Sequence, residues 1–204
     1  MGITSAYTLG CDNSFRNLSN SKGGLVSESI LIGRYIRGKK TWVAVPHSAE
    51  CFSSCAYILA AGVVRYPFGD VGIHRPYFVT PPNQSYDASL KEILKQSKEY
   101  FQEMNVPEFL AEDMFSISPS EIRKLGDVLL TKYRLNQTDM AYEEENEMKR
   151  AAELGIPRQE YMARFKLYKK YISECLVKFR GNASTSDVVA CGNSSSKRAG
   201  LVAP

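Results

Sequence analysis

The sequence predicts an α/β layer fold followed by helices, and three observations support this prediction. Short β-rich runs alternate with helical patterns between residues 26 and 74, as in folds that layer helices on sheets. From Asp87 onward the pattern becomes helical. The chain has 204 residues, 44% of them hydrophobic and 24% charged, which suits one folded domain plus an extension.

The N-terminal part alternates strands and helices, with glycine and proline marking several of the ends. Val26, Ile30 and Gly33 fall on one stripe of the first predicted helix, and Gly38 stops it. The predicted elements are a strand around Ala6 to Leu9, a helix from Val26 to Arg37, a strand from Thr41 to Val45, a helix from Ser53 to Gly62, and strands from Val63 to Tyr66 and Val71 to His74.

The C-terminal part contains helical patterns separated by turn residues. Asp87 is a plausible cap for the first helix, and Ser118, with Glu121 three residues on, for the third. The predicted helices run from Asp87 to Met104, Pro107 to Phe115, Pro119 to Gly126, Thr138 to Leu154 and Arg158 to Phe179. We therefore expect an α/β domain over residues 1–130, a helical extension over 131–180, and a disordered tail over 181–204.

Charge and hydropathy exclude several classes of protein. The formal net charge of +4 is small, and the basic residues of the last predicted helix are expected to form a solvated face. No RNA-binding signature argues for a nucleic-acid partner. No apolar run approaches the roughly 20 residues needed to span a bilayer. The N-terminus lacks the charged start and apolar core of a signal peptide.

The chain has five cysteines, an odd number without zinc-like spacing. Cys51 and Cys55 lie one helical turn apart, so their spacing allows either a metal pair or a disulfide. Only two histidines are present, so a zinc site would need other ligands. We expect neither a metal nor a cofactor.

Two segments place backbone N–H groups where helices begin. In Ser21-Lys22-Gly23-Gly24 a double glycine opens a helix, and in Cys51-Phe52-Ser53-Ser54-Cys55 a serine follows a β-like run. The N–H groups at a helix start are unpaired and favour negative charge. An acyl-transfer site needs a hydroxyl nucleophile beside such donors.

His74 ends an apolar strand and could act as the base for that serine. Taken singly, each feature has a plainer explanation: a glycine turn, a serine N-cap and a buried core histidine. In combination they occur in the order glycine turn, serine, histidine, each at the end of an element. The combination predicts a serine hydrolase site.

These residues resemble the proteolytic subunit of the Clp proteases. Ser53-Ser54-Cys55-Ala56-Tyr57-Ile58-Leu59-Ala60-Ala61-Gly62 resembles the family's nucleophile helix, Asn20-Ser21-Lys22-Gly23-Gly24-Leu25-Val26 its oxyanion turn, and Gly72-Ile73-His74-Arg75-Pro76 its histidine strand. The resemblance covers about residues 18–130 and is closest to an uncharacterised, often periplasmic bacterial branch with cysteines around the serine. It implies a crotonase-like spiral of ββα units, whose first elements look truncated here.

The resemblance implies a role for each matching residue. Ser53 is the nucleophile, His74 the general base, and the N–H groups of Gly24 and Ser54 the oxyanion donors. Ser53 is preferred to Ser54 because Gly62 then follows it at the family's spacing. Ser54 remains an alternative hydroxyl, and His47, in the loop before the serine helix, is a second candidate base.

Asp113 is the third triad member that the resemblance implies. It precedes Ser118-Pro119-Ser120-Glu121, which is similar to the family's Ser-x-x-Glu helix start, although the register is one residue longer. An exposed helical carboxylate is the plainer interpretation. Asp127 is a lesser candidate, and a dyad of Ser53 and His74 is a further alternative.

The functional hypothesis is therefore a serine peptidase or related hydrolase acting on peptides or proteins, as a homo-oligomer without a membrane span. The alternative is an inactive scaffold of the same fold that serves binding or assembly, and an acyl-CoA enzyme is a third candidate. The resemblance implies a periplasmic location and, in that oxidising compartment, a Cys51–Cys55 disulfide; without a visible signal peptide, the alternative is the cytoplasm.

The two last predicted helices form a candidate hairpin for self-association. Apolar and aromatic residues recur there every three or four positions, so they predict a stripe that must be covered. The stripe consists of Tyr161, Phe165, Tyr168, Ile172 and Leu176. Packing on the protein's own core is the alternative.

Overall fold

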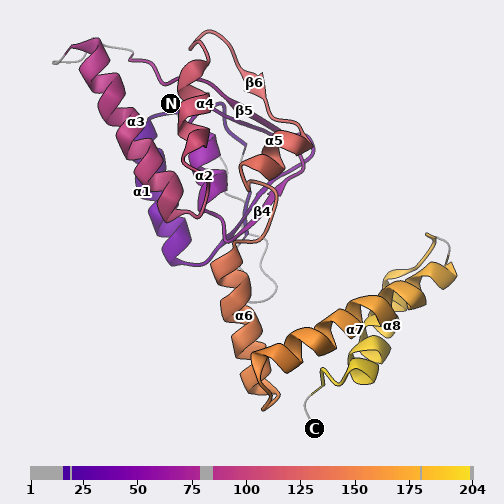
Figure 1. Ribbon diagram of the computed structural model, residues 1–204. Coiled ribbons are helices and arrows are strands. Elements are labelled where there is room, and N and C mark those ends of the chain that lie inside the picture. Colours follow the sequence, from indigo (N-terminus) through magenta and orange to yellow (C-terminus); the bar gives the residue numbers. More distant parts are fainter. Residues whose placement is uncertain (1–15, 19, 79–84, 180, 203–204) are drawn as a thin grey trace. The chain divides into compact units, whose positions relative to one another are not determined.

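The computed structural model describes residues 16–18, 20–78, 85–179 and 181–202, and Figure 1 shows the elements they form. The strand expected around Ala6 to Leu9 lies outside these residues. The chain divides into two compact units, Met1–Asp139 and Met140–Pro204. The boundary falls later than the expected residue 130 because Tyr133 and Leu135 are buried in the core of the first unit.

The first unit contains two small sheets. In one, the parallel strands β1 (Arg16–Leu18), β2 (Trp42–Val45) and β4 (Val64–Pro67) lie in the order β1-β2-β4. In the other, β3 (Glu50–Phe52) pairs in parallel with β5 (Asp70–Ile73), and β6 (Arg123–Lys124) pairs antiparallel with β5. A parallel bridge between Ser21 and Cys51 adds the segment before α1 to the free edge of β3.

Strand–strand–helix units repeat along the first unit. Each strand of the first sheet is followed by pairing in the second sheet and then by a helix. The three units are β1, Ser21 and α1 (Val26–Gly38); β2, β3 and α2 (Cys55–Ala61); and β4, β5 and α3 (Tyr86–Glu103). The repeat places the ends of the second-sheet strands side by side, each just before a helix or loop.

The three helices of these units pack against one another. Helix α2 is buried on nearly every side, which is why its sequence is apolar throughout. Gly33 on α1 lies so close to the Tyr100 ring on α3 that a side chain there would collide with it. The Tyr100 hydroxyl donates to the Tyr57 carbonyl of α2 at 2.7 Å. These contacts hold α1, α2 and α3 as one layer.

The prediction of a helix from Pro119 to Gly126 is wrong. Helix α4 (Phe109–Ser116) is followed by a turn and by β6, and the next helix, α5, begins at Asp127 and ends at Lys132. Pairing with β5 outweighs the local capping signal, since the Leu125 N–H donates to the Val71 carbonyl at 2.8 Å. The cap of α3 is Ser85 rather than Asp87, which lies in the first turn.

A buried polar network closes the first unit at Asp139. Arg65 is 1% exposed and donates to three backbone carbonyls, those of Ala60, Met104 and Arg134. Asp139, 3% exposed, accepts from Arg37 at 2.6 Å and lies 3.7 Å from the Arg65 guanidinium. Burial lowers the pKa of Arg65 to about 10. Each buried charge therefore has a partner.

The second unit consists of helices. They are α6 (Met140–Glu153), α7 (Arg158–Leu176), the short 3₁₀-helix η1 (Val177–Phe179) and α8 (Thr185–Ala199). The tail expected to be disordered is thus largely helical, and that expectation is wrong. A capping box of Ser184 and Asp187 starts α8, and Gly200, at φ +69°, ends it.

Helix α8 also packs along the apolar stripe of α7. A disulfide joins Cys175 on α7 to Cys191 on α8, and Arg164 donates to the Gly200 carbonyl at 2.6 Å. Tyr161 is buried, and Phe165 and Tyr168 are half-buried. The stripe is therefore partly covered by α8, a helix that the sequence did not predict. Among the described helices, none is long and apolar enough to cross a membrane.

Candidate active site

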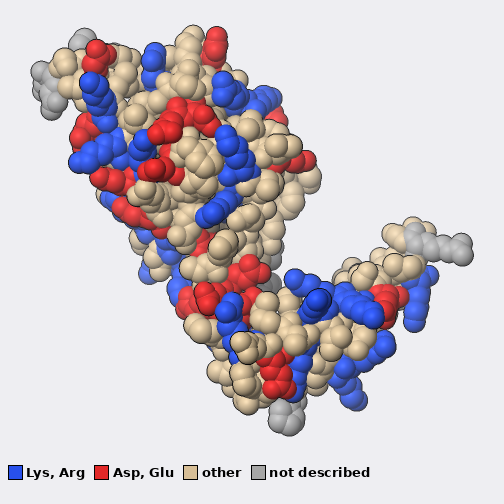
Figure 2. All heavy atoms as spheres, in the orientation of Figure 1, with Lys and Arg blue, Asp and Glu red and all other residues tan. Residues whose placement is uncertain are grey.

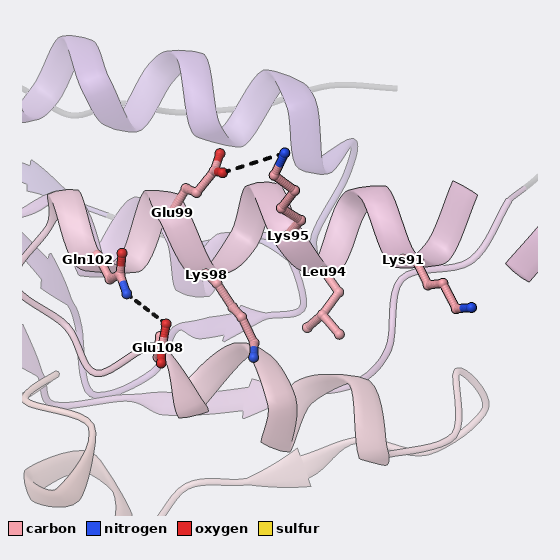
Figure 3. A pocket seen from close by; sticks show the side chains of 7 residues that line it. All are labelled: Lys91, Leu94, Lys95, Lys98, Glu99, Gln102 and Glu108. Carbon is pink, nitrogen blue, oxygen red and sulfur yellow. Dashed lines mark hydrogen bonds and ion pairs between the residues drawn. The ribbon is translucent and has the colours of Figure 1, made fainter. Parts of the chain in front are cut away.

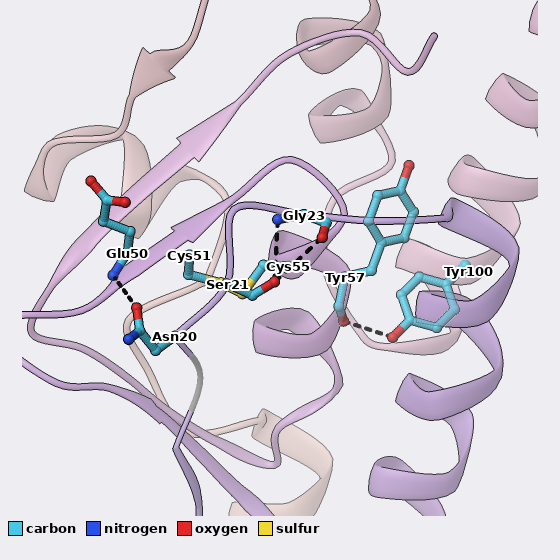
Figure 4. Close-up of a disulfide and its surroundings, with 8 residues drawn as sticks. All are labelled: Asn20, Ser21, Gly23, Glu50, Cys51, Cys55, Tyr57 and Tyr100. Atoms are coloured by element: carbon cyan, nitrogen blue, oxygen red, sulfur yellow. Dashed lines mark hydrogen bonds between the residues drawn. A yellow bond between two sulfur atoms is a disulfide. The ribbon is translucent and has the colours of Figure 1, made fainter. Parts of the chain in front are cut away.

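The glycine turn lies directly beside β3. The Ser21 N–H donates to the Glu50 carbonyl at 2.7 Å, and the Phe52 N–H donates to the Ser21 carbonyl at 2.9 Å. Past this pairing the chain turns, and the Gly23 N–H donates to the Ser21 hydroxyl at 3.2 Å (Figure 4). Gly23 has a φ of +113°, a conformation that L side chains rarely adopt. Glycine is required here by the backbone itself.

Ser53 occupies a strained position between β3 and α2. Its φ is +58°, a left-handed conformation that costs a non-glycine residue about 1–2 kcal/mol. Its N–H donates to the Gly72 carbonyl at 2.9 Å, which anchors the turn to β5. Ser53 is half-exposed, whereas Ser54 is 2% exposed. A strained serine at a strand-to-helix turn is the geometry of a nucleophile elbow.

The glycine turn and the serine touch each other. A Cβ atom on Gly23 would lie 2.7 Å from the Ser53 Cβ and 3.2 Å from its hydroxyl oxygen, and one on Gly24 would lie 3.8 Å from the Ser54 hydroxyl. Within the described residues, the N–H groups of Gly24 and Ser54 have no hydrogen-bond acceptor. Both donors belong to the turns that meet at Ser53 and are free to accept the role of oxyanion donors.

His74 follows the strand next to Ser53. In the parallel pairing of β3 and β5, Phe52 lies opposite Gly72, so Ser53 and Ile73, which follow these two, lie at adjacent strand ends about 5 Å apart. His74 is the next residue after Ile73. His74 is 7% exposed. Its Nδ1 lies 2.9 Å from the Arg75 carbonyl oxygen, which can only accept a hydrogen bond. Nδ1 is therefore the donor in this contact, and in the tautomer that a general base requires Nε2 carries the lone pair.

The described residues show no hydrogen bond between Ser53 and His74. In sites without substrate, catalytic hydrogen bonds are often long and tighten only when substrate binds. The structure places the glycine turn against Ser53 and Ser54, and it places His74 just past the end of β5, the strand that pairs with β3.

Asp113 makes no hydrogen bond with His74 among the described residues. It lies on α4, where its carboxylate accepts from the Tyr133 hydroxyl at 2.6 Å and from Lys132 at 3.4 Å. Burial and the hydrogen bond to Asp113 raise the pKa of Tyr133. The transferred role depended on a helix start at Ser118 that does not form. The Arg75 carbonyl, a backbone group without a sequence signal, is the partner of the His74 ring.

The two lesser candidates also lie apart from the site. His47 packs against the Phe68 ring, with ring centroids 5.2 Å apart, and it precedes the start of β3, whereas Ser53 follows its end. Asp127 is exposed at the start of α5. Neither residue has a contact with His74 or Ser53 within the described part of the chain.

A disulfide encloses the serine turn. Cys51 on β3 is bonded to Cys55, the first residue of α2, with their Cα atoms 5.1 Å apart (Figure 4). Both cysteines are buried. Of the two pairings that their spacing allowed, the structure has the disulfide. The described residues contain no group of three or more side chains placed to hold a metal ion.

A pocket of about 350 Å³ lies elsewhere, on the surface of α3 (Figure 3). Its side chains come from α3 and from Glu108, and include the ion pair of Lys95 with Glu99 and the hydrogen bond from Gln102 to Glu108. None of the residues around Ser53 contributes to it. It is therefore separate from the candidate active site.

Comparison of the sequence with known families and curated proteins finds no relative of this chain. The resemblance to the Clp protease subunit therefore rests on the three motifs.

Proposed function

We propose that this chain is a serine hydrolase, and specifically a peptidase, that acts through an acyl-enzyme on Ser53. The observation that carries the proposal is the left-handed turn of Ser53 in contact with Gly23. A strained backbone at a serine lowers the stability of the fold, and such strained residues cluster at active sites. The repeated strand–strand–helix units support the crotonase-like spiral that the motifs imply.

The chemistry follows from the placement of the groups. The Ser53 hydroxyl attacks the carbonyl carbon of the scissile bond while His74 Nε2 accepts its proton. The carbonyl oxygen becomes an oxyanion held by the N–H groups of Gly24 and Ser54. His74 then gives the proton to the leaving amine, and water hydrolyses the acyl-enzyme with His74 again as base. The Arg75 carbonyl keeps the ring in the required tautomer, so Ser53 and His74 act as a dyad.

Covalent labelling tests this proposal without knowledge of the substrate. A fluorophosphonate probe reacts only with an activated serine, so it should label the wild-type protein and fail to label Ser53→Ala and His74→Ala. Ser54→Ala is the matched control and should retain labelling. Labelling that survives Ser53→Ala but is lost in Ser54→Ala would assign the nucleophile to Ser54.

A non-catalytic scaffold is the second candidate function. The missing hydrogen bond between Ser53 and His74 favours it. An unlabelled wild-type protein that is folded by circular dichroism would support the scaffold and overturn the hydrolase. An acyl-CoA enzyme would use the same oxyanion turn but would not need Ser53, so Ser53→Ala would retain its activity.

The location and assembly of the protein are part of the proposal. Two disulfides support an oxidising compartment such as the periplasm. Leu31 and Tyr35 are exposed on the outer face of α1, at 59% and 67%, and support self-association of a homo-oligomer. Light scattering should then give a multiple of 22.8 kDa for the wild type and a smaller mass for Leu31→Glu/Tyr35→Glu. A monomeric wild type would contradict this assembly.

A further inference from the structure

The α7–α8 hairpin carries a strong excess of positive charge. Figure 2 shows Lys and Arg side chains along this part of the surface. From residue 158 to the end of the chain the basic residues are Arg158, Arg164, Lys166, Lys169, Lys170, Lys178, Arg180, Lys197 and Arg198, and the acidic ones are Glu160, Glu174 and Asp187. The hairpin cannot neutralise itself.

The arginines and the lysines of the hairpin differ in their partners. Arg158, Arg164 and Arg198 each contact a carboxylate. In contrast, no described carboxylate lies within salt-bridge distance of four lysines, which are Lys166, Lys169, Lys178 and Lys197. The Lys169 ammonium lies over the Phe165 ring, 4.8 Å from its centroid. None of the four positive charges is neutralised by a described carboxylate, so they remain available to an anionic partner outside the chain.

Exposed valines gather at the closed end of the same hairpin. Val177 follows α7 and is 71% exposed, and Val188 and Val189 near the start of α8 are 43% and 55% exposed. The Cys175–Cys191 disulfide, with Cα atoms 5.7 Å apart, joins the end of α7 to the middle of α8. Lys178 directly follows Val177. We name Val177, Val188 and Val189 the valine tip.

Two of the lysines lie on one face of α7. Lys166 and Lys169 are three residues apart, so they share a face of the helix. Lys178 lies beside Val177 in η1, and Lys197 lies on α8. The surface therefore combines exposed apolar side chains at one end with unpaired ammonium groups beside them. A rigid disulfide keeps both parts in place.

We propose that this hairpin is a peripheral docking surface for an anionic phospholipid bilayer. The valine tip enters the headgroup region, and the four lysines contact lipid phosphates. Apolar side chains flanked by lysine are the pattern of interfacial membrane binding. Nucleic acid is less favoured, because valines add nothing to phosphate binding and Tyr161, Phe165 and Tyr168 on α7 are buried or half-buried. This proposal does not depend on the hydrolase chemistry.

Sedimentation with lipid vesicles tests the proposal on the full, oxidised chain. Vesicles of phosphatidylcholine with about a third phosphatidylglycerol should pellet the protein, whereas pure phosphatidylcholine should not, and raised salt should weaken the binding. Each lysine changed to glutamine should weaken binding about five-fold, so Lys166→Gln/Lys169→Gln/Lys178→Gln should lose about 100-fold. Val177→Ser/Val188→Ser/Val189→Ser should weaken binding as well.

Matched controls come from the first unit. Val128 is 82% exposed on α5, and Val128→Ser and Lys91→Gln/Lys95→Gln should bind vesicles as the wild type does. Circular dichroism checks that every variant is folded. Equal pelleting with both kinds of vesicle, or hairpin variants that bind normally, would overturn the proposal. Binding to a duplex oligonucleotide but not to anionic vesicles would overturn it in favour of nucleic acid.

Discussion

The two disulfides of this protein differ in what surrounds them. Cys51 and Cys55 are four residues apart, within a unit that has an extensive buried core and the Asp139 network. Cys175 and Cys191 are 16 residues apart, within a unit of helices where few residues are buried. Loop-closure entropy gives about 2 kcal/mol for the short loop and about 3 kcal/mol for the long one.

The difference indicates two separate roles. The first unit can be stable without its disulfide, so the value of Cys51–Cys55 lies in holding the left-handed turn of Ser53. The second unit has little core, so Cys175–Cys191 contributes much of what keeps α7 and α8 together. The Cys51–Cys55 disulfide therefore fixes the geometry of the Ser53 turn, and the Cys175–Cys191 disulfide stabilises the second unit.

Of the changes considered, removing the Asp139 carboxylate should lower the free energy of unfolding the most. It tests whether the stability of the first unit depends on the buried network around Asp139. Asp139→Ala leaves the buried Arg65 without its nearby carboxylate, and such changes cost about 3–5 kcal/mol. The single tryptophan, Trp42, lies on β2, so its fluorescence reports unfolding of the first unit.

The control is Glu103→Ala, which breaks the exposed ion pair with Arg34 and should cost less than about 1 kcal/mol. Equal losses in the two variants would mean that the network contributes little, and that the first unit needs another source of stability.

Gly23→Ala should nearly abolish serine reactivity while the fold remains. The added Cβ would lie 2.7 Å from the Ser53 Cβ, at a φ of +113°, so the turn must shift. A displacement of about 1 Å at a catalytic group costs about 100-fold in rate. Gly38→Ala is the control, because nothing lies within 4 Å of its Cβ. Unchanged probe-labelling rates in Gly23→Ala would show that this contact does not position the nucleophile.

Exchanging the cysteines in pairs tests the central contrast. Cys51→Ser/Cys55→Ser should slow probe labelling about ten-fold or more and lower the stability of the first unit, followed by Trp42 fluorescence, by at most about 2 kcal/mol. Cys175→Ser/Cys191→Ser should leave probe labelling unchanged. In this variant the helical signal in circular dichroism should be lost at a lower denaturant concentration than in the wild type. The reverse pattern would remove the distinction between the two disulfides.

Asp113→Asn should have the smallest effect. Its carboxylate bonds to Tyr133 rather than to His74, so the variant should lose about 1 kcal/mol of stability and keep its labelling rate. A fall in labelling by orders of magnitude, at unchanged stability, would restore the triad that the sequence resemblance implied.

The sequence was a good guide where local signals and tertiary packing agree. The helix from Val26 and the strand ending at Val45 are bounded by Gly38 and Pro46, and both form within a residue or two of expectation. Ser53 and His74 were expected at the ends of elements, and they directly follow β3 and β5. The left-handed conformation of Ser53 could not be predicted from the sequence, because glycine is the residue that indicates a positive φ.

The errors arose where distant contacts decide the structure. Ser118 and Glu121 form a capping pattern, yet the pairing of β6 with β5 turns the following residues into a strand. The small polar residues of α8 suggested disorder, yet Cys191 ties that helix to α7. Neither contact is visible in a local window of sequence. The partner of the His74 ring is the Arg75 carbonyl. Because this is a backbone group, the residue type at position 75 does not indicate it.

A crystal structure of the phosphonylated protein would test the central claim most directly. The claim is that the glycine turn, the strained serine and the histidine converge on one reacting centre. We predict a covalent bond from Ser53 Oγ to phosphorus and a phosphonyl oxygen about 2.7–3.1 Å from the N–H groups of both Gly24 and Ser54. A phosphonyl oxygen that points into solvent, or an adduct on another residue, would contradict the account.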